Sequence, residues 1–150
     1  MSPADVLARL RRFLLAFSVL LLGGSLVELF LVEHTEDAVQ LIPFALCGLG
    51  ALAALAALFK PRRATLLALR ACMLLVVAGS LFGIYQHVSH NYAFQQEVNP
   101  NATGGELLRG ALGGANPLLA PGILAVAAVL ALAAAYRHEV NAERGTTNVE

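Results

Sequence analysis

Four long apolar runs constrain this sequence more than any other feature. They cover residues 13–32, 38–59, 64–88 and 118–136. Each is close to the roughly 20 residues with which a helix crosses a hydrocarbon core of about 30 Å. The chain has 150 residues, of which 58% are hydrophobic and 13% are charged. A chain this short cannot bury so much apolar surface in a water-soluble core. The sequence therefore predicts an all-α fold, a transmembrane four-helix bundle surrounded by lipid.

Local signals mark the ends of the predicted helices. Ser2-Pro3-Ala4-Asp5 is typical of a helix start, and the apolar run that follows is too long for the core of a cleaved signal peptide. The connection between the third and fourth spans contains Thr103-x-x-Glu106, a capping box that predicts a short helix over residues 107–112 in the outer interface. We expect one membrane domain over residues 1–140 and a disordered cytoplasmic tail over residues 141–150.

Small and basic residues refine this picture of the spans. Gly79-xxx-Gly83 favours close contact between helices in lipid, and Arg70 is near enough to the inner end of its span to snorkel. Cys47 and Cys72 fall at different predicted depths, so we expect buried thiols and no disulfide.

The placement of basic residues predicts the orientation. Lys and Arg gather on the cytoplasmic side of membrane proteins. In this topology only Arg109 falls outside, and both termini are cytoplasmic. The residues assigned to the inside are Arg9, Arg11, Arg12, Lys60, Arg62, Arg63, Arg70, Arg137 and Arg144.

The same topology places an acidic, histidine-rich set of residues at the outer end. Glu28 lies inside the first apolar run, where a carboxylate needs a partner or a proton. Helical spacing puts Ser80, Gly83, His87 and Asn91 on one face of the third span. We therefore hypothesise a buried polar pair between Glu28 and His87. The alternative is that Glu28 snorkels to the interface alone.

A metal site is a second hypothesis for this end. Imidazole and carboxylate groups bind divalent transition metals, and the candidate ligands are His34, Asp37, His87, His90 and Glu97. The alternative is a hydrated, hydrogen-bonded rim, because no HExxH or paired ExxH signature is present. Haem ligation is disfavoured because these histidines lie at the rim and no CxxCH occurs.

Other function classes find little support in the sequence. The formal net charge of zero argues against a nucleic-acid partner. No G-x-S-x-G motif occurs, and Ser89 beside His90 would point away from it on a helix, so an enzyme is not expected.

The stretches Glu28–Pro43, Asn91 to Pro100 and Leu119–Gly122, with Tyr136-Arg137-His138, resemble a group of small bacterial membrane proteins with four spans. That group has no assigned activity, so the resemblance implies architecture and not chemistry. We expect a non-enzymatic accessory or scaffold protein of the bacterial inner membrane that contacts other membrane subunits or itself. The alternative is a protein that senses or transports a divalent cation or protons through the outer histidines and carboxylates.

Overall fold

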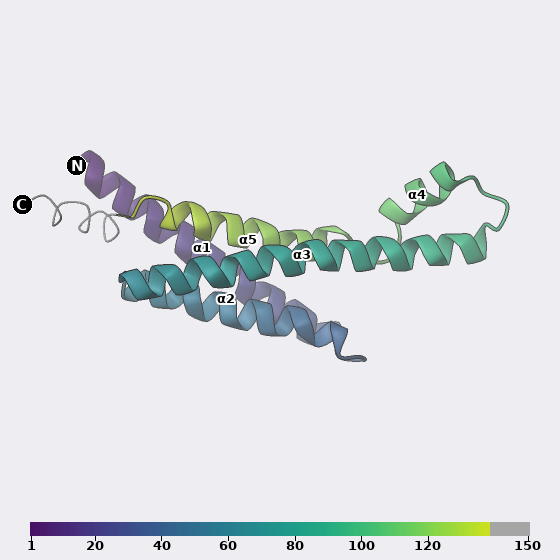
Figure 1. Cartoon of the computed structure of the whole chain (residues 1–150), viewed down its shortest axis with the longest axis horizontal. Coiled ribbons are helices and arrows are strands. Elements are labelled where there is room, and N and C mark those ends of the chain that lie inside the picture. The colour runs from purple at the N-terminus through teal and green to yellow at the C-terminus, as the bar shows by residue number, and fades with distance from the viewer. Residues whose placement is uncertain (139–150) are drawn as a thin grey trace, which may run out of the picture.

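The structure is a computed structural model that describes residues 1–138, and all its regular elements are helices (Figure 1). In chain order they are α1 (Pro3–Leu31), the short 3-10 helix η1 (Val39–Leu41), α2 (Ile42–Phe59), α3 (Arg63–Val98), α4 (Gly104–Leu112) and α5 (Leu119–Ala135). The predicted all-α class is confirmed for this part of the chain. The tail predicted to be disordered, residues 141–150, lies outside the described residues.

Helices α1, α2, α3 and α5 pack side by side and form what we call the helical body. α1 and α3 each pack against both α2 and α5, whereas α2 and α5 make little contact with each other. The N-terminus, the α2–α3 connection and the C-terminal end of α5 lie together at one end (Figure 1). We call this the basic end, because it carries Arg9, Arg11, Arg12, Lys60, Arg62, Arg63 and Arg137. At the opposite end, α3 continues beyond the other three helices (Figure 1).

Narrow stripes of small and medium side chains hold the helical body together. α2 buries Cys47, Gly50, Ala54 and Ala57, at spacings that keep them on one helix face. A Cβ atom on Gly50 would lie 3.1 Å from Leu22 on α1 and 3.3 Å from Val76 on α3, so this glycine allows three helices to approach closely. α5 contributes a buried face made almost entirely of alanine: Leu124, Ala127, Ala128, Ala131, Ala134 and Ala135. Such small residues favour helix packing in lipid.

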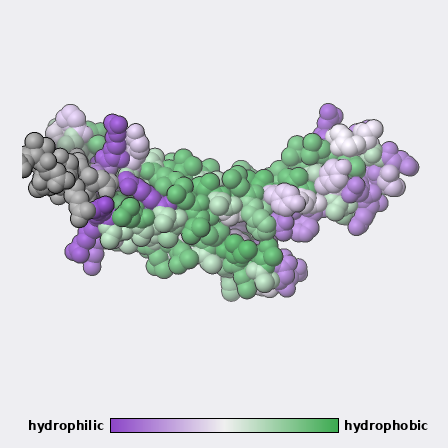
Figure 2. Space-filling view, in the orientation of Figure 1, coloured by the Kyte–Doolittle hydropathy of each residue, from purple (hydrophilic) through white to green (hydrophobic). Residues whose placement is uncertain are grey.

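Many of the larger apolar side chains face outward. Leu20, Leu52 and Leu74 are 66%, 65% and 61% exposed, although each lies well inside its helix. In the space-filling view, hydrophobic residues cover the middle of the body and hydrophilic ones lie at both ends (Figure 2). Water would oppose this arrangement by about 25 cal/mol for each Å² of apolar surface. The protein is therefore embedded in a membrane.

Three helices of the described chain have the length and composition of membrane spans. The helices over Pro3–Leu31, Val39–Phe59 and Arg63–Val98 are long and apolar enough to cross a membrane. α5 is equally apolar but has 17 residues, and its rise is roughly 25 Å. The fourth span therefore stays a prediction.

Two arginines from neighbouring helices bind the C-terminal end of α5. Arg70 on α3 donates from Nη2 to the carbonyl of Ala135 at 2.7 Å. Arg11 on α1 donates to the carbonyls of Tyr136 and Arg137 at 3.2 and 2.9 Å. The last carbonyls of a helix lack partners within it and attract cations. Arg70 therefore fixes α5 in place, a role that differs from the snorkelling expected from the sequence.

The outer part of α3 and the whole of α4 form what we call the arm, residues 90–112. α3 runs unbroken to Val98, whereas the apolar pattern predicts a span that ends near residue 88. α4 packs along this outer part of α3, with Leu107 and Ala111 buried. It lies away from the helical body and not beneath it (Figure 1).

The predicted capping box opens α4. The Glu106 carboxylate accepts hydrogen bonds from the backbone amide and the hydroxyl of Thr103, both at 2.8 Å. These bonds hold the pKa of Glu106 below its usual value. The stabilisation that they give α4 is complete above the ordinary carboxyl pKa, and it is lost as the pH falls through the lowered one.

Gly83 provides a test of the contact between α3 and α5. A Cβ atom there would lie 3.0 Å from Cβ of Pro121, whose ring cannot rotate away. We expect Gly83→Val to lower the free energy of unfolding in detergent by about 1–3 kcal/mol through overpacking. Gly48→Val is the matched control, because nothing lies within 4 Å of a Cβ atom on Gly48. Equal effects of the two substitutions on thermal unfolding would contradict this packing.

Candidate functional site

A cavity of about 480 Å³ opens at the end of the helical body opposite the basic end. Its walls come from the C-terminal end of α1, the start of α2, the middle of α3 and the start of α5. Its ionisable lining residues are Glu28, His34, Asp37, His87 and His90, and no Lys or Arg of residues 1–138 lines it. We call it the His/carboxylate cavity. The sequence had singled out all five of these residues, from two separate stretches of chain.

A backbone motif at the end of α1 positions His34. The amide of His34 donates to the carbonyl of Leu29 at 3.0 Å, and the amide of Glu33 donates to that of Phe30 at 3.2 Å. This pair of bonds is a Schellman motif, and it requires the left-handed conformation that Glu33 adopts with φ of 51°. α1 therefore ends at Leu31 and does not continue through His34 and Asp37. The chain turns instead and brings both side chains to the cavity.

Asp37 is held by the next turn of the chain. Its Oδ1 accepts a hydrogen bond from the amide of Gln40, within η1, at 2.9 Å. The side-chain oxygen of Gln40 in turn accepts from the amide of Glu36 at 2.8 Å. One carboxylate oxygen of Asp37 is thus used by the backbone, and the side chain stays exposed at the mouth of the cavity.

The geometry of His87 fixes which ring nitrogen carries a proton. Nδ1 of His87 lies 2.9 Å from the carbonyl oxygen of Pro117. A carbonyl only accepts, so Nδ1 must donate, and Nε2 is left as the site for a proton or a cation. Glu28 lines the same cavity, but no hydrogen bond joins Glu28 and His87 within residues 1–138. The partner of His87 is therefore a backbone carbonyl near α5 and not the predicted carboxylate on α1.

The polar face of α3 that the sequence predicted does form, and it binds the chain around the start of α5. Ser80 donates to the carbonyl of Pro121 at 2.6 Å. Asn91, which is 2% exposed, donates to the carbonyls of Ala111 and Asn116, both at 2.9 Å. Oδ1 of Asn91 accepts from the amide and from the side chain of Asn116, at 3.0 and 3.1 Å. Helical spacing predicts that Asn91 lies on this face, but it does not predict these partners.

The predicted metal ligands are only partly brought together. His34, Asp37, His87 and His90 line the cavity, whereas Glu97 lies exposed on the arm and outside it. Within the described residues, no three His, Cys, Asp or Glu side chains are close enough to hold one metal ion. A metal site at this cavity stays a prediction, and it would need these side chains to move toward each other.

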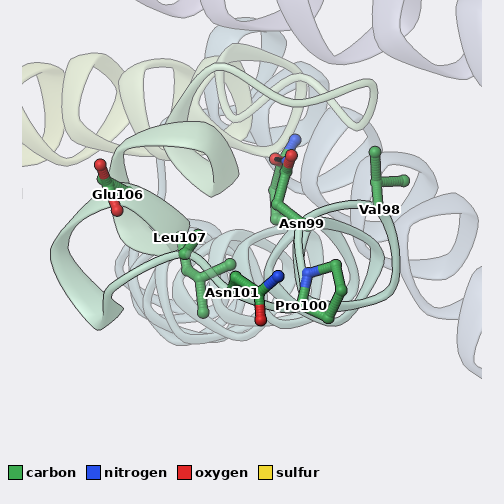
Figure 3. A pocket seen from close by; sticks show the side chains of 8 residues that line it. Val98, Asn99, Pro100, Asn101, Glu106 and Leu107 are labelled. Atoms are coloured by element: carbon green, nitrogen blue, oxygen red, sulfur yellow. Dashed lines mark hydrogen bonds between the residues drawn. The ribbon is translucent and has the colours of Figure 1, made fainter.

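A second hollow, of about 580 Å³, lies on the arm between α3 and α4 (Figure 3). Its lining is mostly amide and apolar, with Asn99, Pro100 and Asn101 from the connecting turn. Its one carboxylate, Glu106, is already used by the capping box. This hollow therefore offers fewer reactive groups than the His/carboxylate cavity does.

The Asn91 hydrogen bonds provide a test of how the cavity wall is held. We expect Asn91→Ala to lower the free energy of unfolding by about 1–3 kcal/mol, because four hydrogen bonds to the chain around Asn116 are lost. It should also speed proteolysis of residues 113–118. Asn99→Ala is the control, since Asn99 is exposed and its amide bonds only to Gln95. Unchanged melting and proteolysis of Asn91→Ala would show that these bonds do not hold the wall.

No family model, no curated protein and no solved structure matches this chain. The resemblance to small bacterial four-span proteins therefore stays a prediction, and the function is argued from the residues themselves.

Proposed function

We propose that this protein is a four-span protein of a bacterial inner (cytoplasmic) membrane, with both termini in the cytoplasm. The gathering of Lys and Arg at the basic end supports this orientation. With 17 residues, α5 is at the short limit for a span, and a thin or locally thinned bilayer accommodates such a helix. The packing of α5 between α1 and α3 supports a fourth crossing.

Within that membrane, the protein acts as a non-enzymatic accessory or scaffold subunit. The observation that carries this proposal is the length of α3. Its 36 residues rise roughly 54 Å, whereas the hydrocarbon core is about 30 Å thick. With its start at the inner boundary, α3 carries the arm well clear of the lipid on the other side.

Apolar side chains on the arm support a protein contact there. Phe94 and Val98 on α3 are 56% and 58% exposed, and Leu108 and Leu112 on α4 are 49% and 57% exposed. Each pair is spaced i, i+4 and so shares a helix face. Exposed apolar residues in water, beyond the reach of lipid, favour a partner polypeptide that covers them. That partner is another membrane subunit or a second copy of this chain.

Photo-crosslinking in intact membranes tests the scaffold proposal. A crosslinking residue placed at Phe94 or at Leu108 should give discrete adducts with a polypeptide, because the arm contacts its partner there. The matched control is Leu74, which is 61% exposed on the helical body and faces lipid in this proposal. Adducts at neither arm position, or the same adducts at Leu74, would contradict it.

A second candidate function is the sensing or transport of a divalent cation or protons through the His/carboxylate cavity. The bond from His87 to Pro117 favours it, because it leaves Nε2 available as a base. Metal-ligating histidines are commonly oriented by such a bond to a carbonyl.

Elemental analysis of the purified protein tests the metal version of this candidate. The metal version predicts a bound divalent metal in the wild type and its loss in His87→Ala/His90→Ala. Glu97→Gln should keep the metal, because Glu97 lies outside the cavity. A wild type that remains free of metal after dialysis against Zn²⁺ or Mn²⁺ would remove this version.

A further inference from the structure

We propose that the His/carboxylate cavity binds an amphipathic organic cation, a molecule that carries one positive charge on an apolar body. This inference rests on the second candidate function, that the cavity takes up a cation, and it names the class of cation. Three features of the cavity support it: its charge, its apolar wall and the spread of its ligating groups.

The ionisable side chains that line the cavity include carboxyl groups and, among the described residues, no Lys or Arg. Glu28 and Asp37 supply these carboxyl groups. The carboxylate of Glu28 accepts no hydrogen bond within residues 1–138, and that of Asp37 accepts one, from a backbone amide. A concave site lined by one sign of charge, with low-dielectric walls, concentrates ions of the opposite sign.

Part of the cavity wall is apolar. Leu29, Leu46 and Leu124 line it, and Phe82 adds an aromatic ring. The ring face of phenylalanine attracts organic cations as well as apolar groups. A volume of about 480 Å³ falls within the range of small-molecule sites, and these are mostly apolar with a few polar groups that orient the ligand. The wall thus fits the body of such a ligand, and the carboxylates fit its charge.

The spread of the ligating groups disfavours a bare metal ion as the occupant. A metal ion needs several donors at about 2.0–2.6 Å from one point. No three candidate donors of the described chain lie that close together. A diffuse organic cation has no such requirement, since its attraction to carboxylates acts over several ångströms.

Binding of tetraphenylphosphonium to the full chain in nanodiscs tests this inference by equilibrium dialysis. Tetraphenylborate has nearly the same shape and the opposite charge, so it reports apolar partition alone. We expect saturable binding of the phosphonium above the level seen with empty nanodiscs, and no saturable binding of the borate. Glu28→Gln and Asp37→Asn should each lower the affinity for the phosphonium about tenfold, because each removes one charge.

Matched variants distinguish binding at the cavity from attraction to carboxylates elsewhere on the surface. Glu36→Gln and Glu97→Gln remove carboxylates outside the cavity lining and should leave the phosphonium affinity unchanged. Phe82→Leu keeps the wall apolar but removes the aromatic ring, and it should lower the affinity for the phosphonium. Thermal unfolding of each variant shows whether it folds, and Glu28→Gln should fold because Glu28 is exposed.

The outcomes distinguish this inference from the function on which it rests. Absence of saturable phosphonium binding, equal binding of the borate, or equal loss in Glu97→Gln would each overturn the inference. Binding of Zn²⁺ or Mn²⁺ without the phosphonium would overturn it and leave the second candidate function standing. Binding of neither metal, protons nor phosphonium at the cavity would overturn both.

Discussion

The solvent that surrounds the helical body is the constraint on which the rest of the structure depends. Its interior holds small side chains such as Gly50, Ala54 and Ala131, while Leu52 and Leu74 face outward. In water this arrangement would be unfavourable, because large apolar side chains such as these leucines would contact the solvent. In lipid it is favourable, because close packing and hydrogen bonds between helices, and not the exclusion of water, bring helices together. Hydrophilic residues consequently lie mainly toward the two ends (Figure 2).

α5 shows how polar groups at the two ends of the body position an apolar helix. Its own residues are nearly all apolar, and hydrogen bonds from α1 and α3 hold its two ends. At one limit, Arg70 and Arg11 bind the last carbonyls. At the other limit, Ser80 and Asn91 on α3 bind the chain that enters it. A short apolar helix without side-chain caps of its own thus takes its position from its neighbours. The wall of the His/carboxylate cavity depends on the same bonds.

Signals confined to a few neighbouring residues were readable in the sequence. The helix start at Ser2 and the capping box at Thr103 involve side chains three residues apart, and both formed where the sequence predicts them. The shared face of Ser80, His87 and Asn91 was also readable, because spacing on a helix determines which side chains lie together. Spacing does not determine which neighbour that face meets. This is why the chain before α5, and not Glu28, is the partner of His87.

The end of α1 agrees with the predicted end of the first span at residue 32, whereas the end of α3 was harder to predict. Glu33 ends α1 in a left-handed conformation that usually belongs to glycine, so the end of the apolar run, and not a glycine, indicated where α1 stops. The apolar run of α3 ends where lipid is expected to end, but the helix continues to Val98. Hydropathy reports the solvent around a residue and not whether its backbone is hydrogen-bonded in a helix. The length of the arm was hidden for that reason. The two stretches that line the cavity were visible, but their shared cavity was not.

Cysteine accessibility measures the central claim most directly. Single cysteines replace Glu36, Lys60, Leu74 or Asn101 in a Cys47→Ala/Cys72→Ala background, and a membrane-impermeant maleimide is added to intact spheroplasts. Positions 36 and 101 should be labelled at once, and position 60 only after the membrane is opened. Position 74, although 61% exposed on the protein surface, should resist labelling in both conditions because lipid covers it. Ready labelling at position 74 in intact membranes, or equal labelling at positions 36 and 60, would contradict the account.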